Sequence, residues 1–307
     1  MTLSPPAPRR TRTGGAAAHW VARSPVRVRP YLELMRVDRP VGTWLAVLPG
    51  WLALALADDF PPDPRTALVL LLLAFLIRGA GCTINDIVDR RFDARVVRTA
   101  GRPLAAGRID VGRARVFFAA QLAIALPIPL LLGPGAFVVM AVGWLPIVAY
   151  PFMKRITHWP HLWLGPCMSW LALVAWIAVT GSLDATGGLL FAGLVCWAVG
   201  CDVVYAHQDR ESDALVGVRS AAVLLGRRSV PLLVGLYVAT VGCFAAAGWS
   251  AGLGPAFWPL LAGAGAQLAW QLRELDIDDP ASCRRVFLSN PRFAGIVLVA
   301  VLAGRAL

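Results

Sequence analysis

Nine apolar runs dominate this sequence, and each is about as long as a helix that crosses a lipid bilayer. Such a helix takes about 20 predominantly apolar residues, with a range of about 17 to 25. The runs cover residues 41–57, 66–86, 114–132, 135–152, 162–180, 187–206, 229–248, 253–271 and 291–307. They do not alternate between apolar and polar residues as the strands of a membrane barrel do. The sequence therefore predicts an all-α, polytopic membrane protein with about nine transmembrane helices.

The composition excludes an ordinary soluble domain. Hydrophobic residues make up 58% of the 307 residues and charged residues only 15%, whereas soluble domains carry about 25% charged residues. The net charge of +11 would also suit a nucleic-acid-binding protein. The positions of the basic residues decide between these two interpretations.

Most of the 29 lysine and arginine residues fall in alternate loops between the apolar runs. Eight precede the first run, eight lie within 90–115, two are Lys154 and Arg155, four lie within 210–228 and four within 273–292. The other side holds only Arg65 and Arg305, and Arg78 lies inside a run. This positive-inside bias predicts a cytoplasmic N-terminus. It also predicts that the basic surface faces anionic lipid headgroups, with no nucleic-acid partner.

The first 30 residues differ from the rest of the chain. They are rich in arginine, proline and alanine, contain no acidic residue, and lack the apolar core of a signal peptide. We interpret residues 1–30 as a disordered, basic N-terminal arm and 31–307 as one transmembrane domain. An organelle transit peptide is the alternative for the arm.

Two of the apolar runs end in acidic motifs about 120 residues apart. The first is NDIVDRRFD, in which Asn85, Asp89 and Asp93 are four residues apart. The second is DVVYAHQDRESD, which holds Asp202, Asp209 and Asp213. On a helix, each set lies along one face. Both motifs end in D-x-x-x-D, and the charge bias places both on the same side of the membrane.

Such clusters of carboxylates are unfavourable unless a cation neutralises them. Carboxylates four apart on a helix repel each other, and an aspartate at bilayer depth costs about 2.5–3.5 kcal/mol. A small number of hard oxygen ligands suits Mg²⁺, which often bridges to phosphate oxygens. For one motif alone, a solvated helix end would explain the acids equally well. Two motifs on one side favour a shared Mg²⁺ site.

Basic residues near the motifs suggest that this site takes a diphosphate. Arg98 and Arg102 follow the first motif, and Lys154 ends the fourth run. A metal together with lysine or arginine stabilises the negative charge of a leaving diphosphate, although each residue alone is explained by topology. Arg78 lies two turns inside the membrane from Asp86, where an unpaired charge is costly. It either pairs with an aspartate or anchors an anionic group of a substrate.

Four stretches of the chain resemble the UbiA superfamily of intramembrane prenyltransferases. They are YLELMRVDRPVGTWLAVLPGWLAL, NDIVDRRFDARVVRTAGRPL, YPFMKRITHWP and DVVYAHQDRESDALVGVRS. The resemblance runs from about residue 31 to the last apolar run. The YAHQD variant of the second acidic motif favours the branch that acts on 4-hydroxybenzoate in ubiquinone synthesis. Relatives that act on a naphthoate or a haem remain the alternatives within the family.

The resemblance implies a helical bundle around a central cavity that is open to the bilayer, with an active site facing the cytoplasm. The reaction would move a polyprenyl group from polyprenyl diphosphate to the ring carbon ortho to the hydroxyl of 4-hydroxybenzoate. Asn85, Asp89 and Asp93 would hold one Mg²⁺, Asp209 and Asp213 a second, with Asp202 beside them. Arg98, Arg102 and Lys154 would contact the diphosphate, Tyr150 would line the pocket, and Arg78 would face the carboxylate of the acceptor.

Two questions stay open at this point. The membrane would be a bacterial inner membrane, with the mitochondrial inner membrane as second choice. A secondary transporter is the alternative from another class, because such proteins are built from two repeats with charged residues at mid-membrane. The acids here lie at the ends of the apolar runs, which argues against a transporter.

Overall fold

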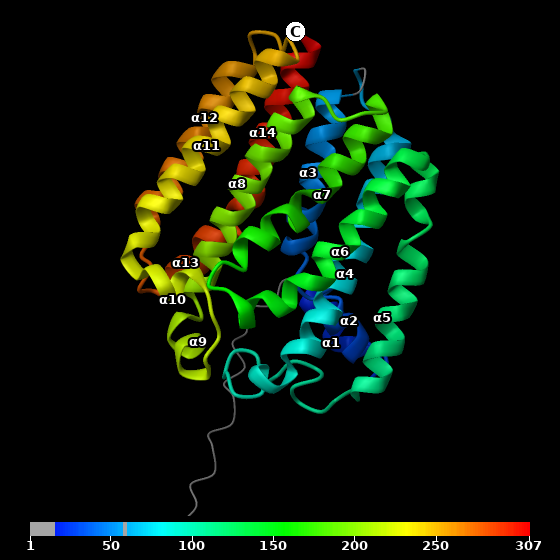
Figure 1. Cartoon of the computed structure of the whole chain (residues 1–307), viewed down its shortest axis with the longest axis vertical. Coiled ribbons are helices and arrows are strands. Elements are labelled where there is room, and N and C mark those ends of the chain that lie inside the picture. The colour runs from blue at the N-terminus through cyan, green and yellow to red at the C-terminus, as the bar shows by residue number, and fades with distance from the viewer. Residues whose placement is uncertain (1–15, 58–59) are drawn as a thin grey trace, which may run out of the picture.

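The computed structural model describes residues 16–57 and 60–307, and within these ranges the chain is helical with no strand (Figure 1). The helices are α1 (Ala16–Arg23), α2 (Arg29–Leu34), α3 (Val41–Ala57), α4 (Pro64–Asp93), α5 (Val111–Ala125), α6 (Pro134–Ile156), α7 (His161–Thr180), α8 (Ala185–His207), α9 (Arg210–Val216), α10 (Ala221–Leu225), α11 (Ser229–Ser250), α12 (Phe257–Glu274), α13 (Pro280–Leu288) and α14 (Asn290–Ala306). Two short 3-10 helices, η1 (Ile128–Leu132) and η2 (Gly226–Arg228), interrupt this series. The predicted all-α fold class is confirmed.

Seven helical segments of the described chain are long and apolar enough to cross a membrane. They are Pro64–Asp93, Val111–Leu132, Pro134–Ile156, His161–Thr180, Ala185–His207, Ala221–Ser250 and Pro280–Ala306. The other two predicted runs also form helices, α3 and α12. However, α3 has only 17 residues, and α12 ends in the polar sequence Gln271-Leu-Arg-Glu274. The count of nine transmembrane helices stays a prediction.

The run predicted at 114–132 is a broken helix. The α-helix ends at Ala125, and the chain continues as the 3-10 helix η1. Pro127 and Pro129 lie at this break, where each lacks the N–H that a continuous helix would use. Pro146, in contrast, lies inside α6 without ending it.

Helices α4 and α8, which lead to the two acidic motifs, both begin at an aspartate that caps the helix. The carboxylate of Asp63 accepts hydrogen bonds from the backbone N–H groups of Arg65 and Thr66 at the start of α4. Asp184 does the same for Gly187 at the start of α8. Such caps satisfy N–H groups that have no partner within the helix. Each helix then runs the length of the bundle and ends at its motif, in the lower half of Figure 1.

The core joins the two halves of the chain. Helix α3 packs on α4, α7 and α14, and α8 packs on α7 and α11. Large side chains buried at this centre include Leu70, Leu73, Leu194, Trp197 and Phe293. The outer surface carries exposed apolar side chains such as Leu68, Leu145 and Val238. Apolar surface on this scale suits a lipid environment, so the chain is an integral membrane protein.

The N-terminal arm is described only in part. Residues 1–15 lie outside the described residues. Of the rest, Ala16–Arg23 form α1, and Val21 in this helix is buried. This differs from the disorder predicted for 1–30. The physical reason is an alanine-rich stretch with high helix propensity, in which the Val21 side chain packs against the rest of the protein.

Candidate active site

The two acidic motifs meet in a cavity of about 130 Å³, which we call the carboxylate pocket. It lies among the ends of α4, α6 and α8, the segment after α4, the start of α7 and the segment that carries α9 and α10. Its walls include Asp89, Asp93, Arg98, Arg102, Tyr150, Lys154, Asp202, Asp209 and Asp213. Nine of the eleven predicted site residues therefore line one pocket. The other two, Asn85 and Arg78, lie deeper along α4.

The first motif supplies two buried carboxylates to this pocket, and each is held by a basic side chain. Asp89 is 8% exposed and accepts a hydrogen bond of 3.1 Å from Lys154 Nζ. The same ammonium group lies 3.3 Å from Asn85 Oδ1, which ties Asn85 to the pocket indirectly. Asp93 is 7% exposed and accepts 2.8 Å from Arg102 Nη1. Arg102 and Lys154 were predicted to contact a diphosphate. In this structure they instead donate hydrogen bonds to the carboxylates of Asp93 and Asp89.

An ion pair joins the second motif to the segment that follows the first. Arg98 donates from Nε to Asp209 Oδ1 at 2.6 Å and from Nη2 to Asp209 Oδ2. Its Nη1 also donates to the hydroxyl of Tyr205 at 2.9 Å. A bidentate pair of this kind is strong and directional. It fixes the two halves of the pocket against each other.

Asp213 has no ion pair among the described residues. Burial, reinforced by the charge of Asp209, raises the pKa of the Asp213 carboxyl to about 7. A cation in the pocket would favour the ionised form of this carboxyl. The donor set, made of carboxylates and the Asn85 amide, is the hard oxygen chemistry that Mg²⁺ prefers.

The geometry adds a condition for metal binding. Within the described parts of the chain, no three His, Cys, Asp or Glu side chains converge on one point as metal ligands would. Asp89, Asp93 and Asp209 each face a guanidinium or ammonium group instead. Metal binding by this set would require the carboxylates to exchange these partners for the ion, and would free the basic groups to hold an anion.

Asp202 has a partner that sequence reasoning missed. His161 is buried, and its Nε2 accepts a hydrogen bond of 3.1 Å from the backbone N–H of Ala221. The proton of the neutral ring is therefore assigned to Nδ1, which lies 2.5 Å from Asp202 Oδ2 and donates to it. His161 starts α7, 41 residues before Asp202. No local pattern reveals that pair.

Arg36 is a second residue missed at the level of sequence. It adopts a left-handed backbone conformation, with φ of 58°, which costs free energy in any residue other than glycine. Its Nη2 lies 2.5 Å from Asp86 Oδ1, and Arg102 Nη1 lies 3.3 Å from the same oxygen. Asp86 therefore ties the segment after α2 to the base of the acidic motif. It does not line the carboxylate pocket.

Arg78 is half-buried on α4, where it faces the start of α3. Its Nη1 donates to the thiol of Cys82. Its guanidinium lies against Gly42, where a Cβ atom would come within 2.2 Å of Arg78 Nε. Among the described residues it forms no ion pair, so it does not neutralise an aspartate. Its charge is available to an anionic group.

The sequence matches proteins with assigned names over nearly its whole length. Residues 46–297 match the UbiA prenyltransferase family. The Bos taurus protein named 4-hydroxybenzoate polyprenyltransferase, mitochondrial, is 41% identical over 94% of this chain and 79% of its own length. Proteins of the same name from Homo sapiens and Arabidopsis thaliana are 39% and 40% identical, over 98% and 92% of this chain and 83% and 70% of their own lengths.

Solved structures show the same helical fold at lower identity. An apo UbiA homologue from Aeropyrum pernix K1 superimposes with a TM-score of 0.74 and 23% identity, over 84% of this chain and 96% of that one. A UbiA homologue from Archaeoglobus fulgidus, bound to GPP and Mg²⁺, gives 0.71 and 19%, over 91% and 100%. With the family matched across 46–297 and this fold shared, the chain belongs to the UbiA prenyltransferase family.

Proposed function

We propose that this protein transfers a polyprenyl group from polyprenyl diphosphate to the ring carbon of 4-hydroxybenzoate ortho to its hydroxyl. The observation that carries the proposal is the carboxylate pocket, where both acidic motifs meet Arg98, Arg102 and Lys154. The names of the three relatives above support this choice of donor and acceptor. A secondary transporter is disfavoured, because the family is one of prenyltransferases.

The basic residues of the pocket would bind and polarise the diphosphate. Arg98, Arg102 and Lys154 offer fixed donors to its oxygens once they leave Asp209, Asp93 and Asp89. Donors that face a developing negative charge stabilise the leaving group more than the bound substrate. The bond between the allylic carbon and the diphosphate oxygen then breaks, and its electron pair leaves with the diphosphate.

Asn85, Asp89, Asp93, Asp209 and Asp213 would hold Mg²⁺. Bound there, the ion would supply Lewis-acid charge that neutralises the leaving diphosphate. The Archaeoglobus fulgidus homologue bound to GPP and Mg²⁺ supports this choice of metal.

The acceptor would bind on the membrane side of the diphosphate. Arg78 would pair with its carboxylate, which orients the ring carbon towards the allylic carbon. That ring carbon forms the new bond, and the ring then loses a proton. Asp202 is our candidate acceptor for this proton, because it lines the pocket and its hydrogen-bond partner is the neutral His161 ring instead of an arginine or a lysine. The apolar interior would protect the allylic cation from water.

Membranes that contain the full-length protein test this function directly. Labelled polyprenyl diphosphate, 4-hydroxybenzoate and Mg²⁺ should give a prenylated acid, identified by mass spectrometry, and a chelator should abolish it. Replacing the acceptor with a naphthoate or a haem should give no product. Product from one of these acceptors alone would move the protein to another branch of the family. Transport of a solute without formation of any prenylated product would contradict the proposed enzymatic function.

The membrane and the orientation are part of the same proposal. The three relatives carry mitochondrial names, so we propose an inner membrane, either bacterial or mitochondrial. The carboxylate pocket would face the cytoplasm or the matrix, because the 90–115 and 210–228 segments hold twelve of the basic residues. Single cysteines introduced at exposed Val97 and Leu215 should be labelled from the same side. Labelling from opposite sides would contradict the shared pocket.

His161 should affect turnover through Asp202. His161→Ala removes the donor that orients the Asp202 carboxylate, and we expect kcat to fall about tenfold to a hundredfold, the usual cost of a misplaced group. His161→Asn places an amide N–H near the position of Nδ1 and should restore part of the loss, whereas His161→Gln places it near Nε2 and should not. The KM for polyprenyl diphosphate should change little.

The neighbouring His158→Ala is the matched control, because His158 forms no hydrogen bond or ion pair among the described residues and lies outside the carboxylate pocket. It should retain wild-type kcat. Equal losses for His161→Asn and His161→Gln would show that His161 only packs.

A further inference from the structure

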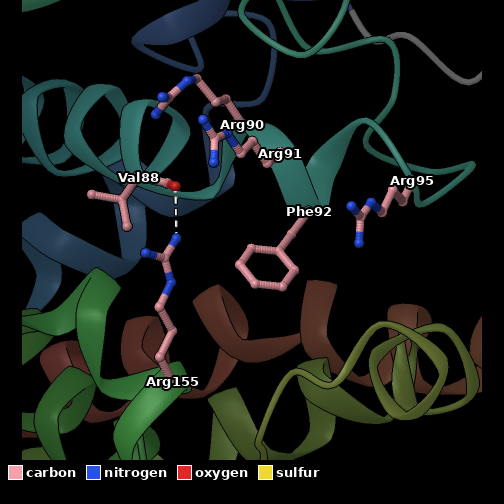
Figure 2. A pocket seen from close by; sticks show the side chains of 6 residues that line it. All are labelled: Val88, Arg90, Arg91, Phe92, Arg95 and Arg155. Carbon is pink, nitrogen blue, oxygen red and sulfur yellow. Dashed lines mark hydrogen bonds between the residues drawn. The ribbon is translucent and has the colours of Figure 1, made fainter.

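A second cavity lies beside the carboxylate pocket and is lined mainly by arginine. It has a volume of about 430 Å³ and is lined by Val88, Arg90, Arg91, Phe92, Arg95 and Arg155 (Figure 2). We call it the arginine pocket. Three of its arginines come from the end of α4 and the turn after it, and Arg155 comes from the end of α6. Phe92 is the one residue that lines both cavities.

The charges in the arginine pocket are largely unneutralised. Arg90 donates to the carbonyl of Ile87 at 2.9 Å, and Arg155 donates to that of Val88 at 2.7 Å, the dashed line in Figure 2. Arg155 also lies 3.6 Å from Asp89 Oδ1. Arg91 and Arg95 have neither a hydrogen bond nor an ion pair among the described residues. No acidic side chain lines this pocket.

Other arginines in the same part of the chain are neutralised by carboxylates. Arg98 pairs with Asp209, Arg102 with Asp93, and Arg108 with Glu33. The arginine pocket is therefore not explained by a general excess of basic residues at this end. Four guanidinium groups around one cavity repel each other, and each keeps N–H donors that no protein acceptor uses. An anion would relieve both conditions.

The surroundings indicate what kind of anion would bind. Phosphate oxygens match the guanidinium fork, and the volume lies within the range of ligand pockets. Exposed apolar side chains lie within three residues of Arg95 or Arg155 along the chain: Val97 is 93% exposed, Ile156 64% and Phe152 41%. The aromatic ring of Phe92 adds an apolar wall, with the Arg155 guanidinium 5.2 Å from its centre. Guanidinium donors next to apolar surface suit a phosphate headgroup with acyl chains beside it.

We propose that the arginine pocket binds a phosphate-bearing group, supplied by the headgroup of an anionic phospholipid. Basic pockets between transmembrane helices are suited to such headgroups. The site is distinct from the proposed diphosphate site, with which it shares only Phe92. It does not depend on the proposed function.

The test uses the purified full-length protein in phosphatidylcholine nanodiscs that contain a small fraction of phosphatidylglycerol. Native mass spectrometry counts the phosphatidylglycerol molecules retained by each protein. The variant is Arg91→Gln with Arg95→Gln, because both side chains are exposed and lack a protein partner. We expect wild type to retain phosphatidylglycerol with at least about tenfold higher affinity than this double variant.

A matched control carries the same change of charge elsewhere. Arg284→Gln with Arg285→Gln removes two exposed arginines of α13, which form no ion pair among the described residues. It should retain phosphatidylglycerol as wild type does. Equal losses in the two double variants would reduce the effect to general surface attraction and overturn the proposal. Unfolding temperatures in pure phosphatidylcholine check that each variant folds, and Arg91→Gln alone replaces the pair if it does not.

A second arm separates the two sources of phosphate. Inorganic phosphate and pyrophosphate are titrated into the protein both in phosphatidylcholine alone and in the nanodiscs that contain phosphatidylglycerol. Retention of phosphatidylglycerol that millimolar phosphate does not displace assigns the pocket to a lipid headgroup. Binding of free phosphate that the Arg91/Arg95 variant loses, without preference for phosphatidylglycerol, assigns it to a free anion. Loss of neither ligand in that variant overturns the site.

Discussion

Replacing Asp209 with alanine is expected to lower prenyl transfer by about a hundredfold or more, a loss of about 2.7 kcal/mol of transition-state stabilisation. Two effects combine in this variant. The pocket loses a carboxylate proposed to hold Mg²⁺, and Arg98 loses the partner that orients it through two hydrogen bonds. Asp89→Ala should have a similar effect, because it removes the partner of Lys154 on the other side of the pocket.

The amount of each variant that inserts into the membrane should equal that of wild type, since removing an anion from a membrane boundary does not hinder insertion. Turnover is measured at saturating substrate and over a range of Mg²⁺ concentrations. Asp209→Asn, which keeps the size of the side chain, should be nearly as inactive. Its requirement for Mg²⁺ should rise if the carboxylate is a ligand.

Glu211→Ala is the matched control for these variants. Glu211 lies on α9 within the second motif, between Asp209 and Asp213, is exposed, and forms no hydrogen bond or ion pair among the described residues. It should retain wild-type activity. More than about a tenth of wild-type activity in Asp89→Ala or Asp209→Ala, a loss of only ~1.4 kcal/mol, would contradict the two-motif site.

Arg78→Ala is expected to raise the KM for 4-hydroxybenzoate about tenfold to a hundredfold, because a hydrogen bond to a charged group contributes roughly 1.5–3 kcal/mol. The KM for polyprenyl diphosphate should change much less, since Arg78 does not line the carboxylate pocket. Arg78→Lys should restore only part of the affinity, because an ammonium group lacks the planar fork of a guanidinium.

Gly42→Val tests the same contact without removing the charge. A Cβ atom at residue 42 would lie 2.2 Å from Arg78 Nε and 2.3 Å from Nη2, so the guanidinium must move. This variant should therefore also raise the KM for the acceptor. Titration of both substrates and Mg²⁺ against each purified variant decides the role of Arg78. An unchanged acceptor KM in Arg78→Ala would remove this residue from the acceptor site.

Local patterns in the sequence were sufficient for the long apolar helices and for the two acidic motifs that meet in the carboxylate pocket. The length of an apolar run and the spacing of acidic residues along a helix are properties of one segment. The helix over 66–86 and the acidic motif at 85–93 could therefore both be predicted from the sequence. The basic residues near the motifs then indicated a diphosphate, and the family resemblance indicated the prenyl donor and the aromatic acceptor. The break at Pro127 was not predicted, because proline inside a run is compatible with both a continuous and an interrupted helix, as Pro146 shows.

The partners of these residues were decided by the tertiary structure alone. Arg98 meets Asp209 across 111 residues, and His161 meets Asp202 across 41. Such pairs depend on how whole helices pack, and single-residue chemistry does not select one carboxylate among several. The tertiary structure also decides which basic residues line the carboxylate pocket and which line the arginine pocket. Lys154 and Arg155 are adjacent basic residues of α6, yet Lys154 lines the carboxylate pocket and Arg155 the arginine pocket, because neighbouring positions on a helix point in different directions.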